Sequence, residues 1–159
     1  MDRTGAWTYD EMRQTGTDYD SIERVREYDE RMSSLRDVRA EANAILDELD
    51  LSKDDALVEL GSGTGELAIE ASRRCDRVYA LDVSRTMLDY AREKAALRGA
   101  AGIVFVHAGF LGYNHDGPPP AAVVSQLALH HLPDFWQLIA LTRLPDLLAP
   151  GSRLFLRLV

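Results

Sequence analysis

Cysteine is almost absent from the sequence, since Cys75 is the only one among 159 residues. One thiol excludes an intramolecular disulfide and any metal centre built from several cysteines. His130 and His131 are neighbours whose side chains point apart, and no other histidine or cysteine stands at ligand spacing. We therefore expect a fold that rests on packing alone and a chain that binds no metal.

Long apolar runs are missing as well. The longest uninterrupted stretches, such as residues 121–124, are far too short to span a bilayer. Residues 1–5 read Met-Asp-Arg-Thr-Gly and contain no apolar segment of a signal peptide. Apolar residues make up 46% and charged residues 28% of the chain, which is typical of one globular domain. The sequence thus predicts a soluble, cytoplasmic protein with no membrane partner.

Clustered positive charge is the third thing the sequence lacks. Lys and Arg number 18 against 26 Asp and Glu, and the net charge is −8. Residues 1–55 hold 16 acidic and 8 basic side chains, whereas residues 56–159 hold 10 of each. A surface that binds a nucleic-acid backbone needs Lys and Arg in clusters, and here the bases stand among acids. Nucleic acid is therefore a disfavoured partner.

The first third of the chain predicts an arm followed by two helices. Residues 1–20 carry Trp7, Tyr9 and Tyr19 without a clear period, and Ser21 can cap a helix to about residue 32. Ser33 or Ser34 can cap a second helix with an apolar face through residue 49. We expect residues 1–32 to form an N-terminal arm and helix beside a domain of residues 33–159. The arm's aromatic side chains most simply pack on the core, and the alternative is a lid over the strand ends.

From residue 56 onward, short apolar runs alternate with helical segments. Strands are expected at 56–60, 77–83, 103–108, 121–126 and 153–159, and helices at 66–74, 84–98 and 134–148. Pro145 should kink or break the last helix. This alternation predicts an α/β fold with a doubly wound, mainly parallel sheet that is covered on both faces by helices.

A glycine-rich loop follows the first expected strand. It reads Val58-Glu59-Leu60-Gly61-Ser62-Gly63-Thr64-Gly65-Glu66. Glycines permit positive φ and close approach of the backbone to a ligand. In a dinucleotide-binding turn the third glycine comes three residues after the second, and that position is Glu66 here. An NAD-dependent oxidoreductase is therefore the less favoured interpretation.

An acidic residue followed by glycines at 61, 63 and 65 resembles the first motif of the class I S-adenosylmethionine-dependent methyltransferases. In that family the second strand ends in an acidic residue that binds the ribose of the cofactor, and Asp82 stands at this place. The segments 123–134 and 148–155 are also similar to the family, so that the resemblance covers roughly residues 35–159.

The resemblance implies a Rossmann-like sheet in the order 3-2-1-4-5 and S-adenosyl-L-methionine as cofactor. The methyl group would pass to an unidentified small-molecule acceptor. His130 is a weak candidate for a general base, since methyl transfer from a sulfonium can proceed mainly by positioning. The residues expected at the cofactor are Glu59, Gly61, Ser62, Gly63, Thr64, Gly65, Asp82, Val83, Met87, Gly109, Phe110 and Ser125.

The chain also departs from the family pattern. Gly109 stands where the family usually has an acidic residue for the adenine amino group, so adenine recognition would depend on backbone groups and on Phe110. The family's sheet continues into a sixth and seventh strand, whereas this sequence ends at Val159. We expect either a fragment truncated at its carboxyl end or a homodimer that covers the edge of the 153–159 strand. A non-catalytic, cofactor-binding or partner subunit is the alternative to an enzyme.

Overall fold

The fold is a central parallel sheet with helices on both faces. The computed structural model describes residues 8–13 and 19–158, and their five strands lie in the order β3-β2-β1-β4-β5. Every neighbouring pair is parallel. The strands are β1 (Ala56–Leu60), β2 (Arg77–Asp82), β3 (Ile103–His107), β4 (Ala122–Gln126) and β5 (Arg153–Arg157). The predicted fold class and strand order are confirmed.

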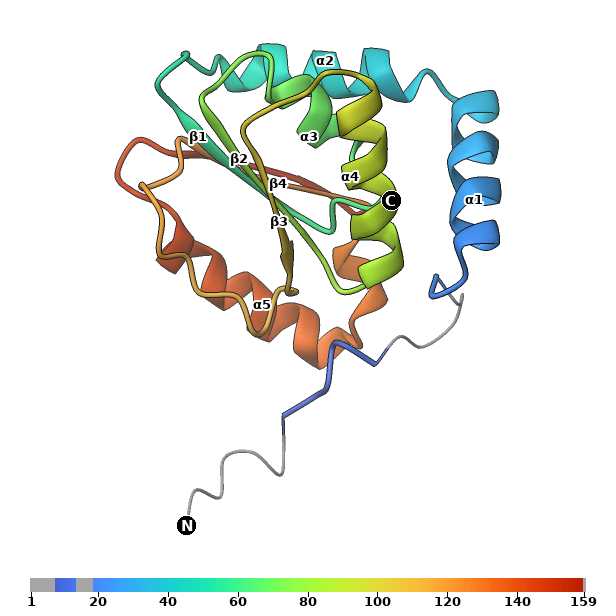
Figure 1. Ribbon diagram of the computed structural model, residues 1–159. Coiled ribbons are helices and arrows are strands. Elements are labelled where there is room, and N and C mark those ends of the chain that lie inside the picture. Colours follow the sequence, from blue (N-terminus) through green and yellow to red (C-terminus); the bar gives the residue numbers. More distant parts are fainter. Residues whose placement is uncertain (1–7, 14–18, 159) are drawn as a thin grey trace.

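The sheet has an apolar core on each of its two faces. For this reason the strand sequences are continuous apolar runs and do not alternate between apolar and polar residues. All five residues of β1 are buried, because a central parallel strand is covered on both sides. Leu57 belongs to one core cluster, together with residues of α2 (Val38–Leu49) and α3 (Glu66–Ala71). Val58 belongs to the cluster on the opposite face, with Leu144 of α5 (Asp134–Leu147). Figure 1 shows α2, α3 and α4 (Arg85–Leu97) on one side of the sheet and α5 on the other.

The first two helices differ from the sequence-based expectation. Helix α1 (Ile22–Leu35) runs through Ser33 and Ser34, and α2 is capped instead by Asp37, whose side chain accepts a hydrogen bond from Ala40 N over 2.9 Å. Leu35 would be the first apolar residue of a second helix that began at Ser33 or Ser34, but it ends α1 and is 68% exposed. The expected boundary after residue 32 thus falls inside a helix. Both Ser and Asp are good cap residues, so the local pattern alone does not choose between them.

Pro145 does not break the last helix. Helix α5 continues to Leu147, two residues beyond the proline. A proline in the final turn removes a single backbone hydrogen bond near a helix end, where the remaining carbonyls lack helical donors anyway. A short 3₁₀ turn, η2 (Leu129–His131), precedes α5. Within the described residues no helix is both long and apolar enough to cross a membrane.

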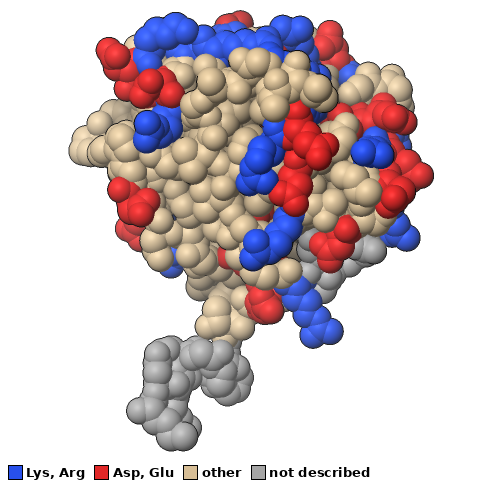
Figure 2. All heavy atoms as spheres, viewed as in Figure 1, with Lys and Arg blue, Asp and Glu red and all other residues tan. Residues whose placement is uncertain are grey.

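Charge is distributed unevenly over the surface. On the face seen in Figure 2, Lys and Arg form a band along the upper edge, while Asp and Glu gather on the side where Figure 1 places α1. Helix α1, which the figures place on that side, belongs to the first 55 residues, where the acidic excess of the sequence lies. Trp7 and Val159 lie outside the described residues.

Candidate functional site

A pocket opens at the carboxyl ends of the strands, where a parallel sheet places its ligands. Its walls come from the loops after β1, β2, β3 and β4 and from the arm that precedes α1. We call it the strand-end pocket. Of the residues expected at a cofactor, its lining contains Gly61, Gly63, Asp82, Val83, Met87, Gly109 and Phe110. Glu59, Ser62, Thr64, Gly65, Ser125 and His130 are not part of that lining.

The loop after β1 is held tightly against its neighbours. The N–H groups of Gly61 and Ser62 both donate to the carbonyl of Leu81, over 2.9 and 2.7 Å. Gly61 has φ +75°, and a Cβ on it would overlap the Cβ of Ala128 in the loop after β4. Only glycine combines this conformation with such a close approach. The loop therefore brings bare backbone to the floor of the pocket.

Asp82 connects the ends of β1 and β2. Its Oδ2 accepts the N–H of Gly63 over 2.8 Å, and its Oδ1 accepts the N–H of Ser84 over 2.9 Å. Burial raises the pKa of Asp82 and outweighs these two hydrogen bonds, which lower it. The carboxyl group is thus oriented by the backbone while it still lines the pocket.

Glu59 lies below the loop rather than in the pocket wall. It is 4% exposed, and burial, with the charge of Asp82, raises its pKa well above the ordinary value. Its Oε2 has no hydrogen-bond partner among the described residues, and the same holds for the hydroxyls of Ser62 and Ser125. These three residues stand on β1, in the loop after it and on β4. They leave unsatisfied polar groups beneath the strand ends.

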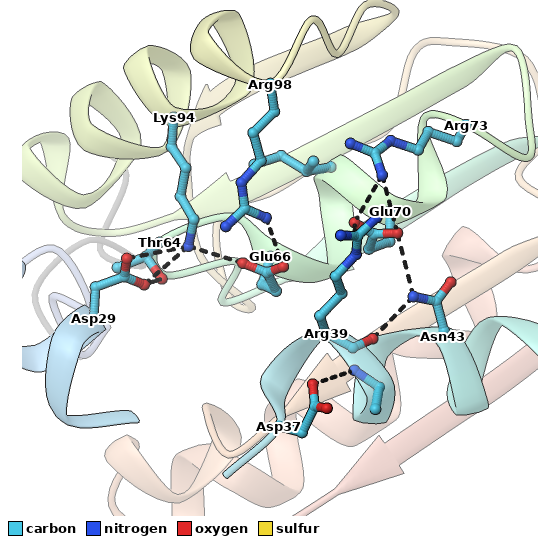
Figure 3. Close-up of polar contacts among 12 residues, drawn as sticks. Asp29, Asp37, Arg39, Asn43, Thr64, Glu66, Glu70, Arg73, Lys94 and Arg98 are labelled. Atoms are coloured by element: carbon cyan, nitrogen blue, oxygen red, sulfur yellow. Dashed lines mark hydrogen bonds and ion pairs between the residues drawn. The ribbon is translucent and has the colours of Figure 1, made fainter. Parts of the chain in front are cut away.

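Thr64 belongs to a polar network that lies outside the pocket lining. The hydroxyl of Thr64 donates to Oδ1 of Asp29 on α1 over 2.6 Å, and Lys94 of α4 donates to the same oxygen over 2.9 Å. Figure 3 shows Lys94 between Asp29 and Glu66, to which it is paired at 2.9 Å. Burial raises the pKa of Asp29, but the hydrogen bonds from Thr64, Lys94 and Tyr90 outweigh it and hold that pKa below 3.8. This network ties α1 to the glycine loop.

The arm and α1 contribute side chains to the pocket. Tyr9 and Tyr19 of the arm and Tyr28 of α1 line it, and the aromatic side chains of the arm were the signal that the sequence offered. Glu11 lines it too, with its carboxylate bound to the N–H groups of Leu111 and Gly112. Nothing in the spacing of the arm indicates that a glutamate at this position reaches a loop 100 residues later.

Comparison with known proteins places this geometry in a family. The sequence pattern of a family described as "Methyltransferase domain" matches residues 57–151. An uncharacterized methyltransferase of Geobacillus kaustophilus is 32% identical over 130 residues, which is 82% of this chain and 57% of that protein. The chain belongs to the methyltransferase domain family. The resemblance to the class I S-adenosylmethionine-dependent methyltransferases is therefore confirmed.

Solved structures agree with this assignment for the methyltransferase domain. The DhpI–SAH complex superposes with a TM-score of 0.67 at 27% identity, covering 87% of this chain and 70% of DhpI. The N-methyltransferase NodS from Bradyrhizobium japonicum, in complex with S-adenosyl-L-homocysteine, has a TM-score of 0.64 at 21% identity. The match covers 74% of this chain and 60% of NodS. The chain spans a little more than half the length of the curated relatives that it matches.

The adjacent histidines His130 and His131 differ in what they contact. Both residues are exposed, and Nδ1 of His130 lies 3.1 Å from the carbonyl of Leu158. His131 lines the strand-end pocket, where partial desolvation, with the charge of His130, lowers its pKa. A histidine with a lowered pKa is neutral near pH 7, which is the form that accepts a proton. The structure thus places His131 at the pocket and His130 beside β5.

Proposed function

We propose that this methyltransferase domain binds S-adenosyl-L-methionine in the strand-end pocket and transfers the methyl group to a small-molecule acceptor. The observation that carries this proposal is Asp82, a carboxyl group that lines the pocket and is held by the N–H of Gly63. A carboxylate offers only acceptors and suits two vicinal hydroxyls such as those of a ribose. The unpartnered Oε2 of buried Glu59 beneath the same loop also fits a polar ligand at this place.

Each part of the pocket has a distinct task in this proposal. When bound, the cofactor supplies an electrophilic methyl group on a sulfonium, and the protein supplies orientation. Asp82 accepts hydrogen bonds from the hydroxyls of the ribose. Gly61 and Gly63 carry no side chain, so the methionine part can approach the backbone there. Val83 and Met87 present apolar surface to the adenine. Methyl transfer then depends on holding donor and acceptor in line.

The arm and α1 act as a lid in this proposal. Tyr9, Tyr19 and Tyr28 stand at the pocket, and aromatic faces favour a nearby positive charge such as a sulfonium. The hydroxyl of Ser84 donates to the carbonyl of Tyr19 over 2.9 Å, which attaches the arm beside Asp82. A closed arm excludes water from the reacting centre.

The choice between adjacent histidines follows from the pocket. His131, and not the expected His130, is the group in position to accept a proton from the acceptor molecule. NodS is named an N-methyltransferase, and a nitrogen nucleophile that must lose a proton is one acceptor compatible with such a base.

We also propose a cytoplasmic location, which the single thiol supports.

We infer that a second copy of the chain pairs with the edge of β5. This strand has one neighbour, β4, within the described part of the chain, and Leu154 is 43% exposed. Arg157 is paired with Glu41 of α2 at 2.9 Å. Because this pair engages its charge, Arg157 does little to prevent another strand from pairing with the edge. Light scattering should show a dimer that Leu154→Lys converts to a monomer. A monomer at all concentrations would overturn this inference.

Calorimetric titration tests the proposed function. We expect S-adenosyl-L-homocysteine to bind and NADH not to bind, because the glycine spacing suits the former. Binding of NADH alone at millimolar concentration would overturn the proposal. Turnover assays with candidate acceptors then separate an enzyme from a cofactor-binding partner subunit, which would bind without methyl transfer.

A further inference from the structure

The strand-end pocket has two acidic side chains among its described lining, Asp82 and Glu11. Asp82 closes β2, near the centre of the sheet. Glu11 comes from the arm and lies at the loop after β3, the outer neighbour of β2. A ligand that uses both groups must extend along the strand ends from β2 toward β3.

Backbone groups hold the carboxylate of Glu11 in place. Oε1 accepts the N–H of Gly112 over 2.7 Å and that of Leu111 over 3.0 Å. Oε2 receives the Leu111 N–H as well, also at 3.0 Å. A loop that turns successive N–H groups toward one point binds a carboxylate in this way.

Gly109 makes the position of Glu11 possible. A Cβ on Gly109 would overlap Oε2 of Glu11, and it would also lie 2.8 Å from Cγ1 of Val83. The carboxylate therefore occupies the space that a side chain at 109 would fill. The loop after β3 thus obtains an acidic group from the arm, 98 residues earlier in the chain, and that group lines the pocket.

An acceptor position remains on Oε2. A carboxylate has about four lone-pair sites on its two oxygens. Among the described residues, Oε2 accepts one hydrogen bond, from the N–H of Leu111, and it shares this donor with Oε1. The group cannot donate as a carboxylate, so a ligand that meets it must bring a hydrogen-bond donor.

The proposed cofactor has such a donor in the right direction. With its ribose at Asp82 and its methionine part over the glycine loop between β1 and β4, its purine must lie on the side of β3. The exocyclic amine of adenine is a donor, whereas a 6-oxopurine has an acceptor at the same place.

We propose that Glu11 is a specificity-determining residue that accepts a hydrogen bond from the exocyclic amine of the cofactor's adenine. This inference rests on the proposed function, since it takes the nucleoside of the cofactor as the ligand. It assigns to the arm a role in selecting the ligand in addition to covering it. A site that pairs a donor rejects an analogue without that donor, because the acceptor that the bound ligand covers is then left unpaired.

The test compares S-adenosylhomocysteine with S-inosylhomocysteine, in which a carbonyl oxygen replaces the amine. Affinities for both are measured by calorimetry with the unchanged protein, Glu11→Gln and Glu11→Ala. We expect the unchanged protein to prefer the adenosyl compound and each variant to reduce that preference by about tenfold or more. The amide that Glu11→Gln introduces can donate to the carbonyl oxygen, so the affinity of this variant for the inosyl compound should not fall.

Loss of affinity for both compounds by the same factor in both variants would overturn the proposal, because it would reduce Glu11 to an anchor of the arm. Glu27→Gln, at an exposed position of α1, is the matched control and should leave both affinities unchanged. Failure of the unchanged protein to bind either compound would overturn the proposed function itself. An unchanged preference in the variants, with normal binding, would overturn only the role of Glu11.

Discussion

The backbone N–H of Gly63 donates to Oδ2 of Asp82 over 2.8 Å. This bond joins the loop after β1 to the end of β2, and it explains why the two motifs act as one unit although 19 residues separate them. The carboxyl group orients the loop, and the loop in turn orients the carboxyl group toward the pocket. In the proposed function, cofactor binding and loop order are therefore coupled at this contact.

Replacement of Asp82 should weaken cofactor binding. Asp82→Ala removes charge-assisted hydrogen bonds to a ribose, and we expect a loss of about 1.5 to 3 kcal/mol in the binding of S-adenosylhomocysteine. Calorimetry measures the change. Asp89→Ala, at a side chain that is 70% exposed on α4, is the control. An affinity equal to that of the unchanged protein would remove Asp82 from the site.

Replacement of His130 and replacement of His131 should have different effects on kcat. We expect His131→Ala to lower kcat by about 10²-fold or more with little effect on cofactor affinity, which is the contribution typical of a general base. His130→Ala should leave kcat nearly unchanged, because its side chain is at the carbonyl of Leu158. Steady-state assays with an identified acceptor decide this. The reverse order of effects would restore His130 as the candidate.

Glu59 should make stability fall as the pH rises. Its pKa is raised in the folded protein, so above the ordinary value of 4.5 the unfolded chain releases a proton that the folded protein retains. The free energy of unfolding therefore declines from about pH 5 upward until Glu59 ionises in the folded state. Glu59→Gln cannot titrate and should gain stability relative to the unchanged protein between about pH 5.5 and 8, as measured by denaturant unfolding.

Exchange of the exposed Glu48 for Gln is the matched control for this measurement. A difference between Glu59→Gln and the unchanged protein that stays constant over the same pH range would contradict the prediction.

Asp29 should stabilise the attachment of α1. Asp29→Ala removes the acceptor for Thr64, Tyr90 and Lys94, and we expect a loss of about 1 to 2 kcal/mol in the free energy of unfolding at pH 7. Because the pKa of Asp29 is held below 3.8, this contribution is present above that pH and disappears as the pH falls through the folded-state pKa.

Denaturant unfolding at pH 7 and pH 3 measures both effects of Asp29→Ala. Glu27→Ala, at an exposed position of the same helix, provides the reference. Equal stability of Asp29→Ala and the unchanged protein at pH 7 would show that the network in Figure 3 does not hold α1.

Much of the fold was predictable because its signals are local. Each strand of the sheet is a short apolar run, and the predicted strands agree with the structure to within one or two residues over the described part of the chain. The start of the second helix was wrong, because Ser33, Ser34 and Asp37 are all competent caps and only packing selects among them. Pro145 was expected to interrupt α5, yet its place in the last turn makes its cost small.

The sequence by itself determined the strand–loop–helix unit with its glycines and the acidic residue at the end of β2, because backbone conformation and strand periodicity depend on near neighbours. Tertiary structure alone decided that Glu11 meets the loop after β3 and that Asp29 meets Thr64. It also placed His131 instead of His130 at the pocket. These contacts join residues far apart in the chain, or depend on the path of a single turn. Their geometry is set by how the helices pack on the sheet, which no local pattern encodes.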